Sequence, residues 1–568
     1  MMKHLLNVLL GVLVATFAQP ALAQASLAPM SPVVSCASLA TLDLSGTTGA
    51  QTTLAASEVA GAKAYCKITG TIARDVRFEV RLPLAGWTQR LLQTGCGGLC
   101  GSLQIHTDNA EGCAPVTDGS IVLASDDMGH HGMGGAWGAN ADQRIDFAYR
   151  GNHVTTLTAK ALIKAFYGRA QRYAYFSGCS DGGREALIEA QRYPDDFDGI
   201  AAGAPALNFT VQNSFHHAWL AKVNTGADGH AILTAIDIKP LHAAVLAACD
   251  GLDGLVDGQI TDPRTCHFDP GVLACKGDYR PGECLTAAQV ATVRAIYGGA
   301  RSATGKRLEV GPVQPGSESE WVGVFVPRAT TGKIGSEGMA LDTINNLLYT
   351  PNRTYTIASF PFTEAMLAGE EDARVLYNAD NPDLGAFASH GGKLILYHGW
   401  SDPHISPLNT IDYYERIGAR MGAGTRDGFV RMFLLPAMGH CGGGEGPSAF
   451  PLLAGLMAWV ENGHAPDMLV AHRKPPMPMG PPPGAGPDGA PKYGGNKDGH
   501  DGPPPEMIRE MMAREAELAQ LGPRARPIYA YPQIAQYNGA GSVNDAASFH
   551  PVTPAAVNGI SDWAGARP

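Results

Sequence analysis

The first two hundred residues alternate between two patterns of hydrophobic and polar positions. Residues 76–82 alternate apolar and polar side chains as a half-buried strand does, and 121–124 is a short apolar run typical of a fully buried strand. Residues 154–167 carry apolar side chains at the spacing of an amphipathic helix, and 173–177 has the pattern of another short strand. A second helix is predicted over 185–193. Strands that alternate with helices predict a mostly parallel sheet with helices on both faces.

This alternation stops near residue 205 and returns near residue 391. The interval between them is rich in glycine turns, histidines and cysteine loops, which predicts an inserted cap, or lid, domain. A proline- and glycine-rich stretch further on is typical of an extended linker. We therefore predict a first catalytic part at 24–204, a lid at 205–390, a second catalytic part at 391–472, a linker insertion at 473–505 and a C-terminal segment at 506–568 that packs on the catalytic domain.

Residues 1–23 have the organisation of a bacterial signal peptide. A short basic start precedes an apolar run, and Ala21-Leu22-Ala23 supplies the small residues that signal peptidase requires, with cleavage predicted after Ala23. No later run of about 18 apolar residues predicts a membrane span. We therefore expect a secreted or periplasmic bacterial protein in an oxidising compartment, with no membrane partner.

Composition and charge narrow the classes of function. The chain has 568 residues, of which 45% are hydrophobic and 17% charged, so it can bury a large core and is not a disordered polymer. Its formal charge of -11 excludes the basic surface that nucleic-acid binding needs. We therefore expect a folded protein with no nucleic-acid partner.

The strongest chemical signal is Gly178-Cys179-Ser180-Asp181-Gly182, a G-x-S-x-G sequence between a predicted strand and a predicted helix. Such a nucleophile elbow holds its serine in a strained backbone conformation and needs small flanking residues where the strand and the helix approach. The same five letters also form ordinary turns in glycine-rich chains, so the placement between strand and helix carries the prediction. We predict Ser180 as a catalytic nucleophile.

A serine hydroxyl needs a base to activate it and an acid to orient that base. In chains of this pattern the order is serine, acid, histidine. Asp402 follows the predicted strand 393–398, and His440 follows the next strand, so both lie in loops at strand ends where such sheets place their sites. We predict Asp402 as the acid and His440 as the base, with His398 and His404 as the competing histidines.

Eleven cysteines in an exported chain predict disulfides, and the odd number leaves at least one cysteine unpaired. Cys179 directly precedes the predicted nucleophile, and Cys441 directly follows the predicted base. If Ser180 and His440 lie within hydrogen-bond reach, their neighbours meet the Cα distance of roughly 4.4–6.8 Å that a disulfide requires. We therefore predict a Cys179–Cys441 bond that ties the base to the nucleophile.

The tetrahedral intermediate of acyl transfer needs preorganised donors for its oxyanion. One is expected to be the backbone N–H of Asp181, the residue after the nucleophile, and a second to come from the glycine-rich loop 95–98. Within that loop we predict Gly97, although the loop can also be a simple tight turn. Cys96 and Cys100 lie beside it, with a spacing and surroundings that do not fit a zinc site.

Four short segments together resemble the tannase and feruloyl esterase family of α/β-hydrolases, which also includes enzymes for other aryl esters such as mono(hydroxyethyl) terephthalate. The segments are Cys-Ser-Asp-Gly-Gly at 179–183, the glycine-rich loop at 95–98, Ser-Asp-Pro at 401–403 and Gly-His-Cys at 439–441. The resemblance covers nearly the whole mature chain, and the paired Cys-Ser and His-Cys motif is specific to this family among α/β-hydrolases. It implies an α/β-hydrolase fold, with a mostly parallel sheet, helices on both faces and a large inserted lid.

The resemblance also implies a function. It is that of a secreted serine carboxylic-ester hydrolase that cleaves esters of phenolic or aromatic acids, tannase- or feruloyl-esterase-like, through an acyl-enzyme on Ser180. The partner is then a small aromatic ester, plant-derived esters included, and no sequence feature separates gallate, ferulate and terephthalate. The alternatives are a hydrolase of another aryl or small ester, a serine peptidase of the same fold, and a calcium-dependent binding protein with a dead site.

Residues 250–260 place three aspartates among glycines, a pattern that suits the hard oxygen ligands of Ca²⁺. The spacing is not that of an EF-hand, and solvated Asp-Gly turns are the alternative. The resemblance implies a structural calcium loop in the lid, with side-chain ligands Asp250, Asp253 and Asp257, backbone ligands Leu255 and Gln259, and ends joined by Cys249–Cys266. No organic cofactor is expected.

The resemblance implies two further disulfides, Cys36–Cys66 and Cys275–Cys284. Among the three remaining cysteines, a Cys100–Cys113 bond would leave Cys96 unpaired beside the oxyanion loop. Where the family often has a C-terminal cysteine, this chain has Tyr529, so that bond is absent. For the acid pocket we consider Phe215, His216 and Trp219 of the lid, because an aryl acid can stack on such side chains, although most lid aromatics are expected to form its core.

Overall fold

The computed structural model describes residues 22, 24–473, 516, 518, 520–555 and 560–567. Apart from Leu22 and Arg473, the predicted signal peptide and the predicted linker lie outside these residues. None of the described helices is long and apolar enough to cross a membrane.

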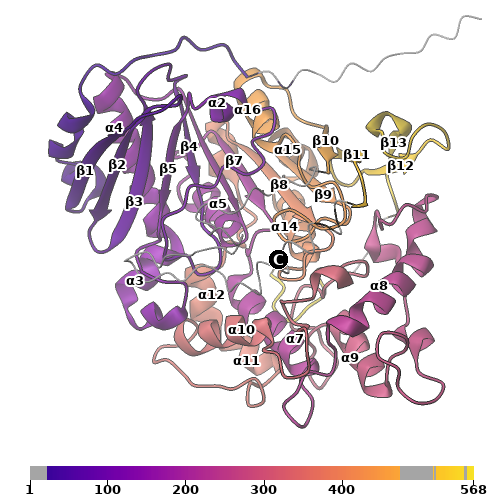
Figure 1. Cartoon of the computed structure of the whole chain (residues 1–568). Coiled ribbons are helices and arrows are strands. Elements are labelled where there is room, and N and C mark those ends of the chain that lie inside the picture. The colour runs from indigo at the N-terminus through magenta and orange to yellow at the C-terminus, as the bar shows by residue number, and fades with distance from the viewer. Residues whose placement is uncertain are drawn as a thin grey trace, which may run out of the picture.

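A nine-stranded sheet forms the centre of the molecule, in the order β1-β2-β3-β5-β4-β6-β7-β8-β9 (Figure 1). Its strands are β1 Thr52–Val59, β2 Tyr65–Ile72, β3 Val76–Pro83, β4 Arg90–Thr94, β5 Val122–Asp126, β6 Tyr173–Cys179, β7 Gly199–Gly203, β8 Lys393–Gly399 and β9 Val430–Leu435. The first three strands and β5 pair antiparallel, and from β5 to β9 every neighbouring pair is parallel. The predicted mostly parallel sheet is therefore confirmed, with an antiparallel extension at one edge.

Alternate side chains of the central strands enter two separate hydrophobic cores. Leu91, Leu394 and Leu396 belong to one core, whereas their neighbours Leu92 and Ile395 belong to the other. Helices α4, α5 and α14 contribute to the first core and α16 to the second. A sheet buried on both faces needs this arrangement, because parallel strands leave neither face to water.

The helices outside the predicted lid have the following bounds: α1 Ser45–Thr48, α2 Ala114–Thr117, α3 Ala141–Ile145, α4 Gly151–Tyr167, α5 Asp181–Arg192, α14 Pro407–Met421, α15 Ala423–Phe429 and α16 Leu452–Asn462. The amphipathic pattern at 154–167 thus corresponds to α4, which begins three residues earlier. The second predicted helix, at 185–193, corresponds to α5, which begins directly after Ser180.

Between β7 and β8 the chain leaves the sheet and forms the lid. Its helices are α6 Phe209–Val211, α7 His217–Val223, α8 Ala235–Cys249, α9 Ala287–Gly298, α10 Gly335–Asn346, α11 Glu364–Ala368, α12 Glu371–Tyr377 and α13 Gly385–His390. Figure 1 shows α7 to α11 gathered below the sheet, and the described residues of this interval add no strand to it. The lid is thus inserted between two adjacent parallel strands of the sheet.

The described C-terminal residues contribute to two small two-stranded antiparallel sheets and form a final stretch on the lid. β10 Met468–His472 pairs with β11 Ala525–Tyr529, and β12 Ile534–Tyr537 pairs with β13 Phe549–Val552. The N–H of Tyr531 bonds the carbonyl of Met432 in β9 at 2.8 Å, whereas Arg374 of the lid donates to the carbonyl of Gly565 at 2.7 Å. The segment therefore contacts the lid as well as the catalytic part, which is a wider contact than the sequence predicts.

Candidate active site

Ser180 lies on a sharp turn between the end of β6 and the start of α5. Its φ of 65° and ψ of -122° place a non-glycine residue in a strained region of backbone space. A Cβ atom on Gly178 would lie 2.3 Å from the carbonyl oxygen of Gly182, and one on Gly183 would lie 2.4 Å from that of Gly203. These glycines let strand and helix approach closely enough to form the turn, which explains the local sequence.

Asp402 and His440 form a hydrogen-bonded pair beside this turn. Asp402 follows β8 and is fully buried, and its Oδ2 lies 2.7 Å from His440 Nδ1. The other oxygen, Oδ1, accepts the backbone N–H groups of His404 at 2.8 Å and Ile405 at 3.0 Å. The loop after β8 therefore fixes the carboxylate so that it faces the histidine that follows β9.

A second histidine, His398, supports the same carboxylate from inside the protein. Its Nε2 lies 3.1 Å from Asp402 Oδ2 and 3.0 Å from the carbonyl oxygen of Ile405, while Nδ1 lies 2.7 Å from the Thr410 hydroxyl. Because both neighbours of Nε2 are acceptors, that nitrogen carries the proton. Burial alone would raise the pKa of Asp402, but His440 and His398 hold it well below its ordinary value. The acid is therefore ionised at neutral pH.

A disulfide joins the turn that carries Ser180 to the loop that carries His440. Cys179 and Cys441 are bonded, with their Cα atoms 5.8 Å apart across a sequence separation of 262 residues. The bond connects the residue before Ser180 with the residue after His440, as the sequence analysis predicts. Among the described residues no hydrogen bond joins the Ser180 hydroxyl to the His440 ring, and such catalytic contacts commonly tighten only when substrate is bound.

Ser180 and His440 line one cavity of about 310 Å³ between the catalytic part and the lid. The accessible surface of its wall is mainly apolar, although more than half of the lining residues have polar side chains. It is lined by Gly98, Leu99, Met133, Ser180, Asp181, Ala206, Phe209, Gln212, Asn213, His217, Met339, Asp342, Thr343, His404, Ile405 and His440. A shaped cavity with a mainly apolar surface and polar groups that fix orientation is the usual form of a small-molecule site.

The three lid residues predicted to bind substrate do not line this cavity. Phe215 is fully buried against Phe360, and Trp219 Nε1 donates to the carbonyl of Ala295 at 2.9 Å. His216 is buried with its Nδ1 2.6 Å from Glu309. The side chains that reach the cavity from this segment are instead Phe209, Gln212, Asn213 and His217. Gln212, Asn213 and His217 lie three, four and eight positions after Phe209 in a continuous helical stretch, a spacing that places the four side chains on one face.

His217 and His404 bring two further imidazoles close to His440. The His404 ring lies 4.9 Å from the His440 ring and 5.7 Å from that of His217, and His217 Nδ1 bonds the Ser336 hydroxyl at 2.9 Å. Burial, followed by the neighbouring histidines, lowers the pKa of His217 well below its ordinary value and that of His404 to about 3. Both rings are therefore neutral at pH 7 and leave His440 free to take up a proton.

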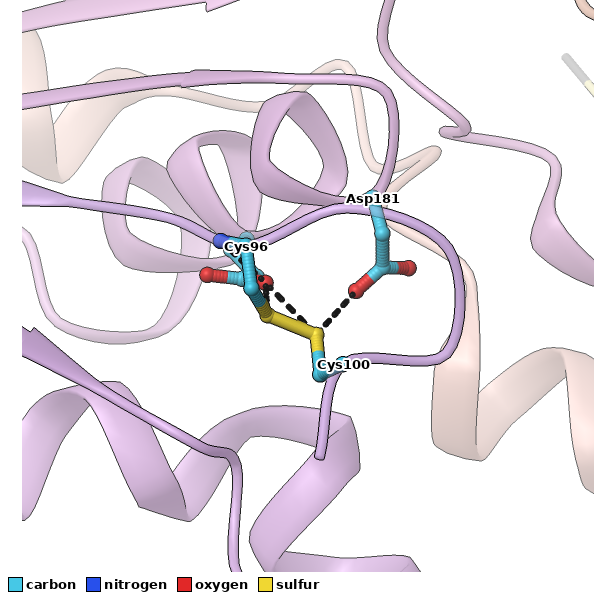
Figure 2. A group of neighbouring side chains, drawn as sticks. Cys96, Cys100 and Asp181 are labelled. Carbon is cyan, nitrogen blue, oxygen red and sulfur yellow. Dashed lines mark hydrogen bonds between the residues drawn. A yellow bond between two sulfur atoms is a disulfide. The ribbon is translucent and has the colours of Figure 1, made fainter. Parts of the chain in front are cut away.

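The glycine-rich loop is closed by a disulfide that the sequence analysis did not expect. Cys96 bonds Cys100, so the Cys100–Cys113 arrangement is wrong (Figure 2). Cys113 is a buried thiol in the second hydrophobic core, 3.6 Å from the sulfur of Met457, whereas Cys96 and Cys100 belong to the first core. The sheet thus separates Cys113 from the other two cysteines. Burial raises the pKa of the Cys113 thiol to about 11.

Two ionisable side chains of α5, which sequence reasoning missed, order this region: Glu185 bonds the loop, and Arg184 bonds Asp181 of the turn. Glu185 Oε1 accepts the backbone N–H of Cys96 at 3.3 Å, and its Oε2 accepts from Asn152 at 2.7 Å. The buried Arg184 donates to both carboxylate oxygens of Asp181, at 2.7 and 2.9 Å. Figure 2 shows the Cys96–Cys100 bridge lying directly beside Asp181. The only sequence signal for these roles is two ionisable residues three and four positions after Asp181, the proposed oxyanion donor.

Of the two residues predicted to bind the oxyanion, Asp181 lines the cavity and Gly97 does not. The neighbouring Gly98 does line it, on the same loop. A Cβ on Gly95 would lie 2.7 Å from Gly182 Cα, so this loop approaches the nucleophile turn as closely as two backbones can. Backbone N–H donors from the loop and from the turn therefore lie near one another at the N-terminal end of α5.

Among the described residues, two groups of cysteine, histidine and carboxylate side chains lie close enough together to hold a metal ion. The first is Cys96, Cys100, Asp181 and Glu185, and the second is His153, Glu189 and Asp196. In the first group the two sulfurs are bonded to each other and Asp181 is paired with Arg184, so the donors that a soft metal prefers are already engaged. In the second group Asp196 is paired with His153 at 2.6 Å and with Lys160 at 3.6 Å.

The aspartate loop of the lid, residues 250–259, lies against the C-terminal segment. A small cavity of about 30 Å³ is lined by four of the five predicted calcium ligands, namely Asp253, Leu255, Asp257 and Gln259, together with Arg526. The fifth, Asp250, instead accepts backbone N–H groups of Gly258 at 2.8 Å and of Asp257 and Gln259 at 3.2 Å. Burial raises the pKa values of Asp253 and Asp257, and the guanidinium of Arg526 contacts Asp257.

Three more disulfides complete the set in the described residues, and they join the pairs that the family resemblance implies: Cys36–Cys66, Cys249–Cys266 and Cys275–Cys284. Cys249–Cys266 closes the aspartate loop. Five disulfides in one chain are typical of proteins that work outside the cytosol.

The lowered pKa values of the buried histidines can be tested by nuclear magnetic resonance. Because burial keeps His404 and His217 neutral, their ring resonances, assigned with His404→Gln and His217→Gln variants, are expected to stay constant and neutral between pH 5 and pH 8. His242 is the internal control. Burial opposes its charge, but Glu318 and Glu445 raise its pKa to about 10, so it should stay protonated over the same range. A midpoint near pH 6.5 for His404 would contradict this account.

Comparison with known proteins agrees with the geometry. Residues 57–552 match the family model described as "Tannase and feruloyl esterase". The chain is 30% identical to "Mono(2-hydroxyethyl) terephthalate hydrolase" of Piscinibacter sakaiensis, over 86% of this chain and 85% of the relative, and 34% identical to "Probable feruloyl esterase B-2" of Aspergillus flavus, over 70% and 76%. The crystal structure of feruloyl esterase B from Aspergillus oryzae superposes with a TM-score of 0.70 at 26% identity, covering 87% of this chain and 91% of that one. The chain therefore belongs to the tannase and feruloyl esterase family, whose members are carboxylic ester hydrolases of the α/β-hydrolase type.

Proposed function

We propose that this protein is a secreted serine esterase that hydrolyses esters of phenolic or other aromatic acids through an acyl-enzyme on Ser180. The observation that carries the proposal is that Ser180 and the Asp402–His440 pair meet at one cavity and are tied together by the Cys179–Cys441 bond. The disulfides support export of the protein.

In the proposed reaction, His440 acts as base and then as acid. Asp402 accepts a hydrogen bond from His440 Nδ1, which leaves Nε2 as the nitrogen that takes the proton from the Ser180 hydroxyl. The hydroxyl oxygen attacks the ester carbonyl, and His440 then passes its proton to the departing alcohol. The buried, ionised Asp402 stabilises the imidazolium that forms between these two steps.

The negative charge on the carbonyl oxygen needs donors that are already in place. We assign these to the backbone N–H of Asp181 and to an N–H of the 95–98 loop, predicted at Gly97, with Gly98 next to it on the cavity wall. The hydrogen bond from the Cys96 N–H to Glu185 of α5 holds the loop beside Asp181, while the Cys96–Cys100 bridge constrains the shape of the loop itself. Water then attacks the acyl-enzyme with His440 as base, and Ser180 leaves as a hydroxyl.

An aromatic acyl group suits the chemistry of the cavity wall. Leu99, Phe209 and Ile405 provide apolar contacts around the serine, and Met133 and Met339 lie at the more exposed rim. Methionine sulfur and aromatic rings contact one another favourably, and apolar burial drives the binding of a ring. The names of two relatives, a feruloyl esterase and a terephthalate ester hydrolase, point to the same class of acid.

Hydrolysis of methyl gallate, methyl ferulate and p-nitrophenyl butyrate by the mature protein tests the proposal. Because Ser180 provides the attacking oxygen, Ser180→Ala should lower kcat by a factor of about 10³ or more on each ester that is cleaved. Ser359→Ala, in an exposed turn of the lid, is the matched control and should keep full activity. Turnover that survives in Ser180→Ala would refute the acyl-enzyme, and turnover of butyrate alone would refute the aromatic acid.

We further propose that the aspartate loop binds one structural Ca²⁺. Asp253 and Asp257 with the carbonyl groups of Leu255 and Gln259 line the small cavity, and Asp250 lies at the start of the same loop. Two half-buried carboxylates with raised pKa values favour a cation between them, because a cation offsets both burial and mutual repulsion. The ion would stabilise the lid and takes no part in catalysis.

Chelation tests this calcium site through stability. If Ca²⁺ binds the folded loop at micromolar affinity, removing it with EDTA should lower Tm by roughly 5 °C or more, and added Ca²⁺ should restore it. Asp253→Asn should abolish the shift, while Asp278→Asn, an exposed aspartate elsewhere in the lid, should preserve it. An unchanged Tm in EDTA would contradict the calcium site and leave Arg524 and Arg526 as the positive charges beside Asp257.

A further inference from the structure

The charged side chains around the catalytic cavity are distributed unevenly. Among the described residues that line it, none is lysine or arginine, and two are acidic. One of these, Asp181, is neutralised by the buried Arg184, which is engaged with both of its oxygens. The other, Asp342, lies on α10 of the lid and is exposed. The wall therefore offers a negative charge at the lid side and no cation.

The two histidines beside the base do not change this balance. His217 and His404 both line the cavity, and burial lowers the pKa of each, so neither is charged at neutral pH. A negatively charged group on the substrate would thus meet neutral imidazoles where it needs a cation. Burying an ion without a partner is costly, so a charged acyl group is penalised in binding and in the transition state alike.

Neutral hydrogen-bonding groups are plentiful on the same wall. The Thr343 hydroxyl and His404 Nδ1 are buried and have no partner among the described residues, although both residues line the cavity. His217 bonds Ser336 through Nδ1, which leaves its Nε2 for another partner. Buried polar atoms are normally satisfied, so unpaired ones on a cavity wall indicate the polarity of the ligand. Here they suit uncharged hydroxyl or carbonyl groups on an aromatic ring.

We propose that the cavity selects its acyl group by charge: it accepts an uncharged aromatic acid and rejects one that carries a second, free carboxylate. Asp342 is the specificity-determining residue, because it places like charge at the lid side of the ring. The inference rests on the proposed esterase function and adds a limit to it. A terephthalate monoester carries a free carboxylate that is ionised at neutral pH. This chain is therefore expected to disfavour the substrate that appears in the name of its relative, "Mono(2-hydroxyethyl) terephthalate hydrolase".

An aromatic diester tests charge and activity in one reaction. Bis(2-hydroxyethyl) terephthalate is neutral, and hydrolysis of one ester consumes one water, releases ethylene glycol and leaves a monoester anion of the same ring. We expect the diester to be consumed and the monoester to accumulate, with kcat/KM for the second step lower by a factor of about ten or more. Chromatography of the time course, with the Ser180→Ala protein as blank, measures both steps.

Charge variants test whether Asp342 determines the discrimination between the neutral diester and the monoester anion. Asp342→Asn should raise kcat/KM for the monoester about twofold, and Asp342→Lys by about fivefold or more, with little change for the diester. Asp372→Lys, an exposed site on α12 that does not line the cavity, makes the same change in net charge and should leave the ratio of the two steps unaltered. Equal effects of the two lysine variants would overturn the role of Asp342.

The remaining outcomes separate this inference from the function on which it rests. Conversion of the diester to terephthalate without accumulation of the monoester would overturn the charge selection but leave the proposed esterase function standing. Refusal of the diester by a protein that cleaves methyl ferulate would also overturn it, because an uncharged ring would then be rejected as well. Failure on every ester would overturn the proposed function itself.

Discussion

The site depends on one covalent constraint, the Cys179–Cys441 bond, which fixes the ends of β6 and β9 relative to each other. In the sheet these strands are separated by β7 and β8, and in the sequence their ends are 262 residues apart with the whole lid between them. Ser180 and His440 each adjoin one of the bonded cysteines. The disulfide therefore keeps the proposed nucleophile and the proposed base close together independently of the lid, and Asp402 contacts His440 from the end of β8.

Around this bond the protein accepts local strain and buried charge. Ser180 holds a backbone angle that ordinary residues avoid, and glycines at 178, 182 and 183 remove the side chains that would forbid it. Asp402 is buried as an anion, stabilised by His440, His398 and two backbone N–H groups. The second bridge, Cys96–Cys100, is local and constrains the backbone of the facing loop, which the N–H of Cys96 joins to Glu185 of α5. The proposed catalytic groups are positioned by the sheet and by the Cys179–Cys441 bond, whereas the lid contributes part of the cavity wall.

Sequence reasoning located the elements whose signal is local or follows from chain order. The strand, turn and helix around Ser180 have distinct patterns, and Asp402 and His440 follow strand ends in the expected order. It failed where the answer depends on which way a side chain points. Cys113 is close to Cys100 in sequence but lies on the other face of the sheet, and His217 rather than His216 faces the cavity because helical phase decides it. Glu185 and Arg184 were missed because charged residues on a helix give no sign of being buried.

The most direct test of the account is to trap the nucleophile with a p-nitrophenyl aryl phosphonate and locate the adduct by intact-mass and peptide mass spectrometry. The account predicts one adduct per chain, on the peptide that contains Ser180, and no adduct in Ser180→Ala. In a folded Cys179→Ala/Cys441→Ala protein the labelling rate should be lower by a factor of about ten or more, because the proposed base is no longer tied to the proposed nucleophile. The Cys275→Ala/Cys284→Ala protein, which lacks a lid disulfide instead, should label at the normal rate. An adduct on another residue, or full-rate labelling without the Cys179–Cys441 bond, would contradict it.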